Sequence, residues 1–215
     1  MKNIGNLMIL GDSYSTFRGY NPEGYEYWYY EDVPPRTDVR DVKDTWWHQF
    51  VAETGANLVL NSAYSGTTIG HTGWHGHDFK KISFCGRFDK RVSDGFFDKH
   101  QIDTLILFGG TNDSWAECPL GEPVFDSWTE KDLYTVLPAI SYLIYRAKTV
   151  LPEARIIFVI NTELKPEITD MIINSCRHFG AEYVKLEDIS KQEGHPNILG
   201  MKQIKDQIIA HLEKN

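Results

Sequence analysis

The sequence has few cysteines and no cluster of basic residues. Its cysteines, Cys85, Cys118 and Cys176, lie far apart and are odd in number. They therefore predict neither a disulfide framework nor a zinc knuckle. Lysine and arginine number 22 against 30 aspartates and glutamates, and they form no basic run. Because a nucleic acid would find no basic surface to neutralise its phosphates, we expect no nucleic-acid partner.

Long apolar runs are also missing. The stretch "NLMIL" (6–10) is too short for a signal-peptide core or a membrane span, and no later run reaches spanning length. We expect no membrane partner. As given, the chain is expected to be cytoplasmic, or secreted or periplasmic if a signal peptide was trimmed. Repeats, low-complexity tracts and linkers are absent too, which predicts one domain over residues 1–215. The oligomeric state stays open.

What the sequence does contain is an alternation of apolar runs and helical patterns. Five runs have the length of strands: 6–10, 57–60, 104–108, 155–160 and 183–186. The first, third and fourth are almost continuous in Ile, Leu, Val and Phe. This composition is typical of parallel strands that are buried on both faces.

Helical patterns separate these runs. They cover residues 45–55, 129–152, 166–180 and 197–213. The second begins with Thr129 and Asp132 at capping-box spacing, and Pro138 inside it is expected to kink the helix. Strands that alternate with helices predict an α/β fold with helices on both faces of a parallel sheet. We expect a three-layer α/β/α sandwich with the flavodoxin-like strand order 2-1-3-4-5.

Two long connections do not fit this minimal pattern. Residues 16–44 are rich in Tyr, Pro and Asp, and residues 63–80 are rich in Gly and His. Long ordered connections in a compact domain are usually functional. Both follow strands whose carboxyl ends, in open α/β sheets, form the ligand-binding edge.

Four short segments supply the groups that acyl transfer needs. Ser13 in "GDSYS" follows the first strand, and Gly66 lies in "NSAYSGTTI" after the second. Asn112 in "GGTND" follows the third strand, and His195 in "EGHPNILG" precedes the last helix. The Ser13 hydroxyl would attack a carbonyl and His195 would take its proton. Backbone N–H groups of Ser13 and Gly66, with the Asn112 amide, would stabilise the oxyanion.

These four segments resemble, in order and spacing, the four blocks of the SGNH (GDSL-type) hydrolase superfamily. The resemblance spans nearly the whole chain. It implies a flavodoxin-like α/β/α fold and a metal-independent esterase or lipase-like activity that needs no cofactor. By this match Ser13 is the nucleophile and His195 the base. Gly66 and Asn112 would complete the oxyanion hole.

Acidic residues near these segments differ in their match to the superfamily. Asp12 and Asp113 match frequent companions of the blocks, and we interpret them as structural. The superfamily usually has an aspartate three residues before the histidine, where this chain has Gln192. Either Glu193 orients His195 as a third catalytic residue, or a backbone carbonyl, such as that of Gln192, holds the second ring nitrogen.

Aromatic residues in the long connections bear on the substrate. Tyr27 and Trp28 belong to a set of rings interleaved with charged residues in 16–44. Such rings stack on sugar faces, although packing onto the sheet is the alternative. We expect Tyr27 and Trp28 to bind substrate, and Trp74 and Trp115 to line the cleft.

The histidines of the second connection are weak metal-ligand candidates. His71, His75, His77 and Asp78 include residue types that bind zinc, but their spacing is loose. We predict no metal site there.

Together these patterns predict a serine esterase that cleaves small acyl esters, with O-acetylated carbohydrates as the favoured substrates. A lysophospholipase or thioesterase of the same superfamily is one alternative. A non-catalytic carbohydrate-binding module on an α/β scaffold is the other.

Overall fold

The centre of the molecule is a five-stranded parallel sheet. The computed structural model describes residues 4–32 and 36–214. Its strand order is β2-β1-β3-β4-β5, which is the predicted order. The strands are β1 (Asn6–Gly11), β2 (Asn57–Asn61), β3 (Thr104–Gly109), β4 (Arg155–Ile160) and β5 (Glu182–Lys185). Each predicted strand is present, and every pair of neighbours is parallel.

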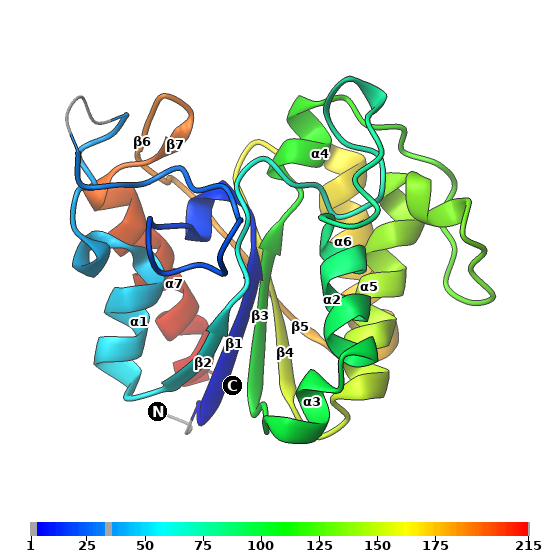
Figure 1. The fold of residues 1–215 in the computed structure, drawn as a ribbon, viewed down its shortest axis with the longest axis horizontal. Coiled ribbons are helices and arrows are strands. Elements are labelled where there is room, and N and C mark those ends of the chain that lie inside the picture. Colours follow the sequence, from blue (N-terminus) through cyan, green and yellow to red (C-terminus); the bar gives the residue numbers. More distant parts are fainter. Residues whose placement is uncertain (1–3, 33–35, 215) are drawn as a thin grey trace.

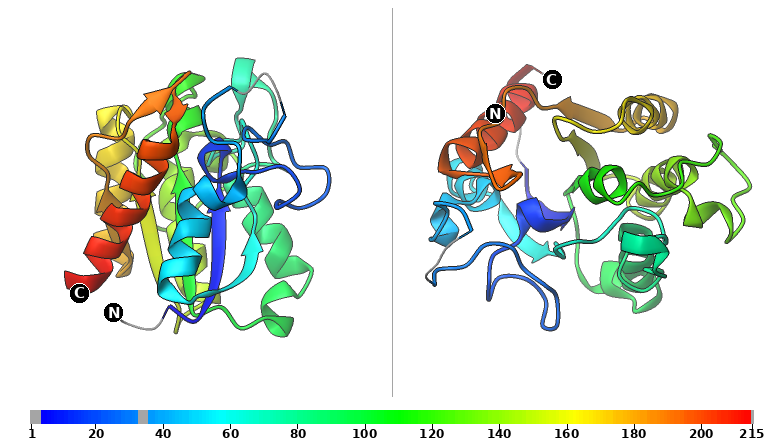
Figure 2. Two further views of the ribbon diagram at one scale, coloured as in Figure 1. Left: turned by 90° about the vertical axis from the view of Figure 1, so that its left-hand side faces the viewer. Right: turned by 90° about the horizontal axis from the view of Figure 1, so that it is seen from above.

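Helices cover both faces of this sheet, as Figures 1 and 2 show. One face carries α1 (Trp46–Thr54) and α7 (Ile198–Lys214). The other carries α2 (Phe84–Ser93), α5 (Val136–Val150) and α6 (Pro166–Phe179). The short helices are α3 (Phe96–Lys99) and α4 (Thr111–Trp115). The result is the predicted three-layer sandwich. Within the described residues, no helix is long and apolar enough to cross a membrane.

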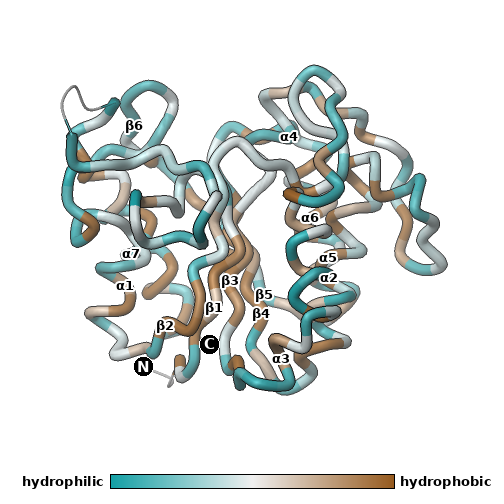
Figure 3. The backbone as a smooth tube through the Cα atoms, viewed as in Figure 1, coloured by the Kyte–Doolittle hydropathy of each residue, from teal (hydrophilic) through white to brown (hydrophobic). Residues whose placement is uncertain are grey.

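A separate hydrophobic core fills the space on each side of the sheet. Along β1, Met8 and Leu10 face the core under α2, α5 and α6. Leu7 and Ile9 face the core under α1 and α7. Because both faces are covered, the central strands β1, β3 and β4 are apolar through their interiors (Figure 3).

The helix predicted to open at Thr129 begins later. Asp132 does accept hydrogen bonds from the Thr129 N–H and hydroxyl, both at 2.7 Å. Only a 3₁₀ turn follows, because Thr135 takes extended backbone angles, and α5 begins at Val136. Pro138 therefore lies in the first turn of α5, where N–H groups have no intrahelical partner. The predicted kink inside the helix is wrong for this reason.

The long connections gather at the carboxyl edge of the sheet, at the top of Figure 1. A hairpin of two short strands, β6 (Lys191–Gln192) and β7 (His195–Pro196), lies at the same edge. Its strands pair Gln192 with His195, which leaves a two-residue turn between them. The fold thereby brings the His195 segment to the end of the sheet where Ser13 follows β1.

Candidate active site

Ser13 and His195 are in hydrogen-bond contact although 182 positions separate them. The Ser13 Oγ lies 2.9 Å from the His195 Nε2. β1 ends at Gly11, and a 3₁₀ helix begins at Ser13. The Asp12 side chain caps this turn by accepting a hydrogen bond from the Tyr14 N–H at 3.1 Å. The turn holds the Ser13 side chain toward the histidine.

The second ring nitrogen of His195 determines which tautomer is present. Its Nδ1 lies 3.0 Å from the backbone carbonyl oxygen of Glu193. Because a carbonyl only accepts hydrogen bonds, the proton resides on Nδ1. The Nε2 lone pair then faces the Ser13 hydroxyl, as a general base requires.

This contact corrects the prediction that the Glu193 carboxylate orients the imidazole. Glu193 and Gly194 form the hairpin turn and have φ angles of 50° and 72°. Positive φ at both positions is typical of a type I′ turn. Here the main-chain carbonyl of Glu193, rather than its carboxylate, bonds the imidazole. The alternative expectation, a backbone carbonyl at the second ring nitrogen, agrees with this contact, although the carbonyl is that of Glu193 and not that of Gln192.

Four aromatic rings surround His195. Trp28 lies parallel to the imidazole at a centroid distance of 3.6 Å, and Tyr14 lies tilted at 5.1 Å. Trp115 and Tyr29 present their rings at steep angles, at 5.7 and 6.4 Å. This enclosure leaves His195 only 4% exposed.

Burial lowers the pKa of His195 to about 4. The hydrogen bond to the Glu193 carbonyl acts in the opposite direction, and the positive charges of Arg36 and Lys191 lower the pKa further. The imidazole is therefore neutral at pH 7 and has a free lone pair on Nε2.

Two buried tyrosines fix the backbone around the histidine. The Tyr14 hydroxyl donates to the carbonyl of Gly194 at 2.6 Å, and the Tyr29 hydroxyl donates to that of Pro196 at 2.9 Å. Sequence reasoning missed both roles. The position of Tyr14, directly after the serine, is the one signal that could have drawn attention to it.

Of the predicted oxyanion-hole residues, Gly66 lies in the turn after β2, Asn112 bonds to that turn from α4, and Ser13 follows β1 at the same edge of the sheet. Gly66 adopts a φ of 80°, which favours glycine. The Asn112 amide donates to the carbonyl of Thr67 at 3.0 Å, and its second N–H remains for a ligand. Among the described residues, no group accepts a hydrogen bond from the Ser13 or Gly66 backbone N–H. Three donors are thus available at this edge.

Arg87, on α2, forms hydrogen bonds to the end of β1 and to the segment that follows β2. It is 2% exposed, and its guanidinium donates to the Gly11 carbonyl and the Thr67 hydroxyl, each at 3.1 Å, and to the Ser62 carbonyl. Burial lowers the pKa of Arg87 to about 10, so it stays charged at pH 7. One arginine therefore links the ends of β1 and β2 and the Gly66 turn. A single arginine among the apolar residues of 84–88 was its only sequence signal.

The two buried aspartates support backbone turns, in agreement with their structural interpretation. Both Asp113 carboxylate oxygens lie 3.0 Å from the Ile69 N–H, which donates to them. Burial raises the pKa of Asp113 to about 6 and that of Asp12 to about 7. The Asp12 Oδ2 is buried and has no hydrogen-bond partner among the described residues.

Comparison with known proteins agrees with the resemblance of the four segments around Ser13, Gly66, Asn112 and His195 to GDSL-type hydrolases. The model of the GDSL-like lipase/acylhydrolase family matches residues 5–212. The chain belongs to this family. It is therefore a hydrolase, as the sequence predicted.

Crystal structures of two proposed GDSL-like lipases are similar to this hydrolase over nearly their whole length. The Bacteroides ovatus protein is 40% identical, with a TM-score of 0.91 and coverage of 98% of both chains. The Bacteroides uniformis protein is 41% identical, with a TM-score of 0.88 and coverage of 98% of this chain and 96% of that one. No curated protein matches the sequence.

A more distant structure shares the fold alone. It is an acetyl xylan esterase from Butyrivibrio proteoclasticus, 16% identical, with a TM-score of 0.62. The match covers 97% of this chain and 63% of the esterase. At this identity it is a likeness of architecture only.

The three other aromatic residues predicted to contact substrate in this GDSL-like hydrolase make different contacts. Trp115 is 40% exposed and meets His195 edge-on, so it lies at the mouth of the site. Trp74 donates from Nε1 to the Gly66 carbonyl at 3.1 Å and thus supports the turn. Tyr27 is 39% exposed and contacts Tyr30, with no ring contact to the histidine among the described residues.

The histidines of the second connection do not converge. His71 is buried and its Nδ1 lies 2.9 Å from the Ser83 hydroxyl. The ring centroids of His75 and His77 are 6.3 Å apart and at right angles. In the described part of the chain, no group of three or more potential ligands is placed to hold a metal ion. The absence of a metal requirement stays a prediction.

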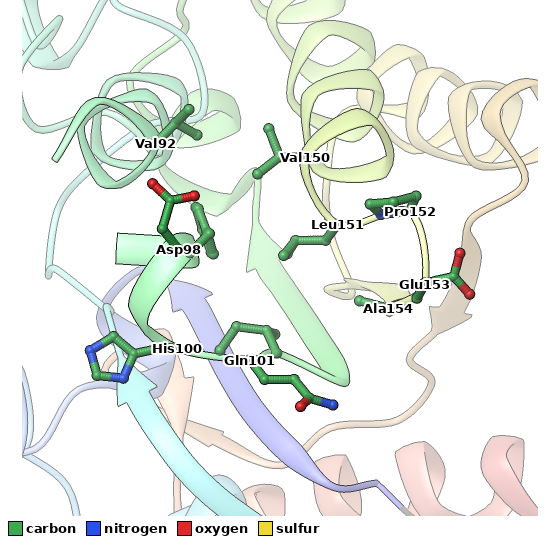
Figure 4. A pocket seen from close by; sticks show the side chains of 11 residues that line it. Val92, Asp98, His100, Gln101, Val150, Leu151, Pro152, Glu153 and Ala154 are labelled. Atoms are coloured by element: carbon green, nitrogen blue, oxygen red, sulfur yellow. The ribbon is translucent and has the colours of Figure 1, made fainter. Parts of the chain in front are cut away.

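A cavity of about 280 Å³ lies away from the candidate site (Figure 4). It is lined by Ile102 and Ala154, which precede β3 and β4, and by residues of α2, α3 and α5. It therefore sits at the amino ends of the strands, whereas Ser13 follows a carboxyl end. This cavity has no contact with the Ser13–His195 pair.

Proposed function

We propose that this hydrolase is a serine esterase that acts on small acyl esters, with acetyl esters of carbohydrates as its favoured substrates. The observation that supports this most is the 2.9 Å contact between the Ser13 Oγ and the His195 Nε2. The neutral imidazole, protonated on Nδ1, is ready to accept the serine proton.

In the first half-reaction Ser13 is acylated. Its Oγ attacks the ester carbonyl while its proton passes to the His195 Nε2. The carbonyl oxygen becomes negative and accepts hydrogen bonds from the Ser13 and Gly66 N–H groups and the Asn112 amide. The C–O bond then breaks, and the imidazolium gives its proton to the departing alkoxide. An alcohol leaves, and an acyl-serine remains.

In the second half-reaction water releases the acid. His195 takes a proton from the water, whose oxygen attacks the acyl carbonyl. The same donors stabilise the second oxyanion. The proton then returns to the Ser13 Oγ as the acid departs. The cycle needs no cofactor, in line with the metal-independent activity that the family resemblance implies.

The side chains at the rim of the site favour a carbohydrate as the alcohol part of the ester. A cavity of about 300 Å³ in the first connection is lined by tyrosines, arginines and carboxylates: Arg18, Glu26, Tyr27, Tyr30, Asp32 and Arg36. Rings combined with charged hydrogen-bonding groups suit the apolar faces and hydroxyls of sugars. Distant neighbours in fold include a family two carbohydrate esterase from Clostridium thermocellum in complex with cellohexaose. We transfer that substrate class to this chain as a proposal.

An ester panel tests this function. We expect turnover of p-nitrophenyl acetate to exceed that of the octanoate, and acetate to be released from acetylated xylan. Ser13→Ala is expected to reduce turnover by about 10³-fold or more. A steep rise in turnover from acetyl to octanoyl esters would support a lysophospholipase or thioesterase instead. Sugar binding without any ester turnover would support a non-catalytic module.

A further inference from the structure

The indole of Trp28 lies flat against the imidazole of His195. Their centroids are 3.6 Å apart and their planes differ by 6°. The guanidinium carbon of Arg36 lies over the indole, 4.3 Å from its centroid. Because the imidazole fills one face of the indole, the guanidinium takes the other. Trp28 therefore has no free face on which a sugar could stack, which corrects the expectation that it binds substrate by stacking.

The backbone that bears this indole is fixed to both halves of the site. The Trp28 N–H donates to the Thr16 hydroxyl oxygen at 2.8 Å, and that hydroxyl donates to the Ser13 carbonyl at 2.9 Å. The next residue, Tyr29, is bonded through its hydroxyl to the Pro196 carbonyl at 2.9 Å. The indole is thus held in a fixed place relative to the nucleophile and the base.

We propose that Trp28 is a positioning residue for His195, whose ring face keeps the imidazole in the plane needed to take the Ser13 proton. The proposal rests on the proposed function, in which His195 is the base. The Glu193 carbonyl holds the Nδ1 with a neutral hydrogen bond, weaker than the bond a carboxylate would make. A parallel ring in van der Waals contact restricts the remaining rotation, because a tilted imidazole would press its edge into the indole.

Arg36 completes the stack from the outer side. Within the described residues Arg36 forms no ion pair, and its guanidinium lies over the indole. Burial is the main cause of the lowered pKa of His195, and the positive charges of Arg36 and Lys191 lower that pKa further. Arg36 therefore clamps Trp28 and also disfavours the protonated imidazole.

Two substitutions of Trp28 distinguish the effect of its flat ring from the effect of its other side-chain contacts. Trp28→Leu is expected to lower kcat for p-nitrophenyl acetate by about tenfold to hundredfold, with KM within about threefold of wild type. Trp28→Phe retains a flat ring, and we expect kcat within about threefold of wild type. It loses no hydrogen bond, because the Trp28 Nε1 has no partner among the described residues. Tyr20→Leu, at an exposed ring of the same connection, is the control and is expected to match wild type.

Three results would overturn the positioning role. The first is a Trp28→Leu enzyme with wild-type kcat. The second is a raised KM with kcat unchanged, which would make Trp28 a substrate contact. The third is a Trp28→Phe enzyme as slow as Trp28→Leu. Circular dichroism and thermal unfolding of each variant identify any loss of fold.

Arg36→Ala provides a second test that does not depend on Trp28→Leu folding. Because Arg36 is exposed, we expect the variant to fold. Removal of the cation raises the pKa of His195, so the acidic limb of kcat/KM is expected to move to higher pH, and kcat to fall severalfold. An unchanged kcat and an unchanged limb would overturn the clamp. Wild-type turnover by Ser13→Ala would instead overturn the proposed function, whatever Trp28 does.

Discussion

Among single residues, His195 is held by a backbone carbonyl at its Nδ1 instead of by a carboxylate. Its Nδ1 bonds the main-chain carbonyl of Glu193, and the Nε2 bonds Ser13. A carbonyl dipole fixes the tautomer as a carboxylate would, but it stabilises the imidazolium less. The sequence predicted that His195 would lie beside Ser13, and the structure places the two in contact. The sequence left the partner of Nδ1 open, because that depends on the φ angles of a two-residue turn, which the residue types at 193 and 194 do not dictate.

The first prediction concerns the Glu193 side chain. Glu193→Gln leaves the main-chain carbonyl in place, so we expect kcat for p-nitrophenyl acetate to stay within about threefold of wild type. The substitution Glu193→Pro is unsuitable because φ is positive at this position. A fall of about tenfold or more in Glu193→Gln, with the fold retained, would mean that the carboxylate takes part in catalysis.

The second prediction concerns the pH dependence of catalysis. The base must be neutral to accept a proton, and burial lowers the pKa of His195 to about 4. Activity is therefore expected to persist as pH falls and to decline only near pH 4, well below the value for an exposed histidine. The measurement is kcat/KM against pH for an ester whose released alcohol is quantified directly by chromatography. An acidic limb near pH 6.5 would contradict it.

Among the helices and strands, those with strong apolar periodicity were predictable. The five strands and the helices at α1, α6 and α7 follow from runs of buried residues and from end signals such as Gly55 and Gly180, both left-handed. By contrast, α2 was missed. Its segment 84–93 contains a glycine and a buried arginine, and its stability depends on tertiary contacts that local sequence does not encode.

The third prediction concerns the position of α2 beneath the site. Arg87→Met keeps the side-chain volume but removes donors to the Gly11 and Ser62 carbonyls. The Gly11 carbonyl keeps the Tyr64 N–H as a donor at 3.1 Å, but the Ser62 carbonyl loses its donor. This buried acceptor is expected to cost about 1 to 3 kcal/mol of unfolding free energy. Urea denaturation at pH 7 measures this. A variant as stable as wild type would show that water or rearranged groups replace the guanidinium.

For the molecule as a whole, topology explains why distant segments meet. Parallel strands joined by right-handed crossovers place all their carboxyl ends at one edge, so residues that follow β1, β2 and β3 converge there. The sequence order therefore predicted that Ser13, Gly66 and Asn112 would share an edge. The aromatic enclosure of His195 was not predictable, because the path of the long first connection has no periodic pattern.

The fourth prediction concerns the pH dependence of global stability. Burial raises the pKa of Asp12 to about 7 from 3.8. The folded state thus binds this proton more tightly than the unfolded state, so the associated stability is full below about pH 4 and is lost as pH rises through 7. Asp12→Asn cannot lose a proton. We expect its unfolding free energy, relative to wild type, to increase by about 2 kcal/mol between pH 5 and pH 8. A difference that is constant with pH would contradict the raised pKa.

The central claim is that Ser13 is a nucleophile activated by His195. The most direct test is reaction with a fluorophosphonate, followed by peptide mass mapping of the labelled site. We predict one adduct, on the peptide that contains Ser13, formed at a rate that His195→Ala reduces by about 10²-fold or more. An unlabelled Ser13 in folded wild-type protein, or equal labelling of the His195→Ala variant, would contradict the account.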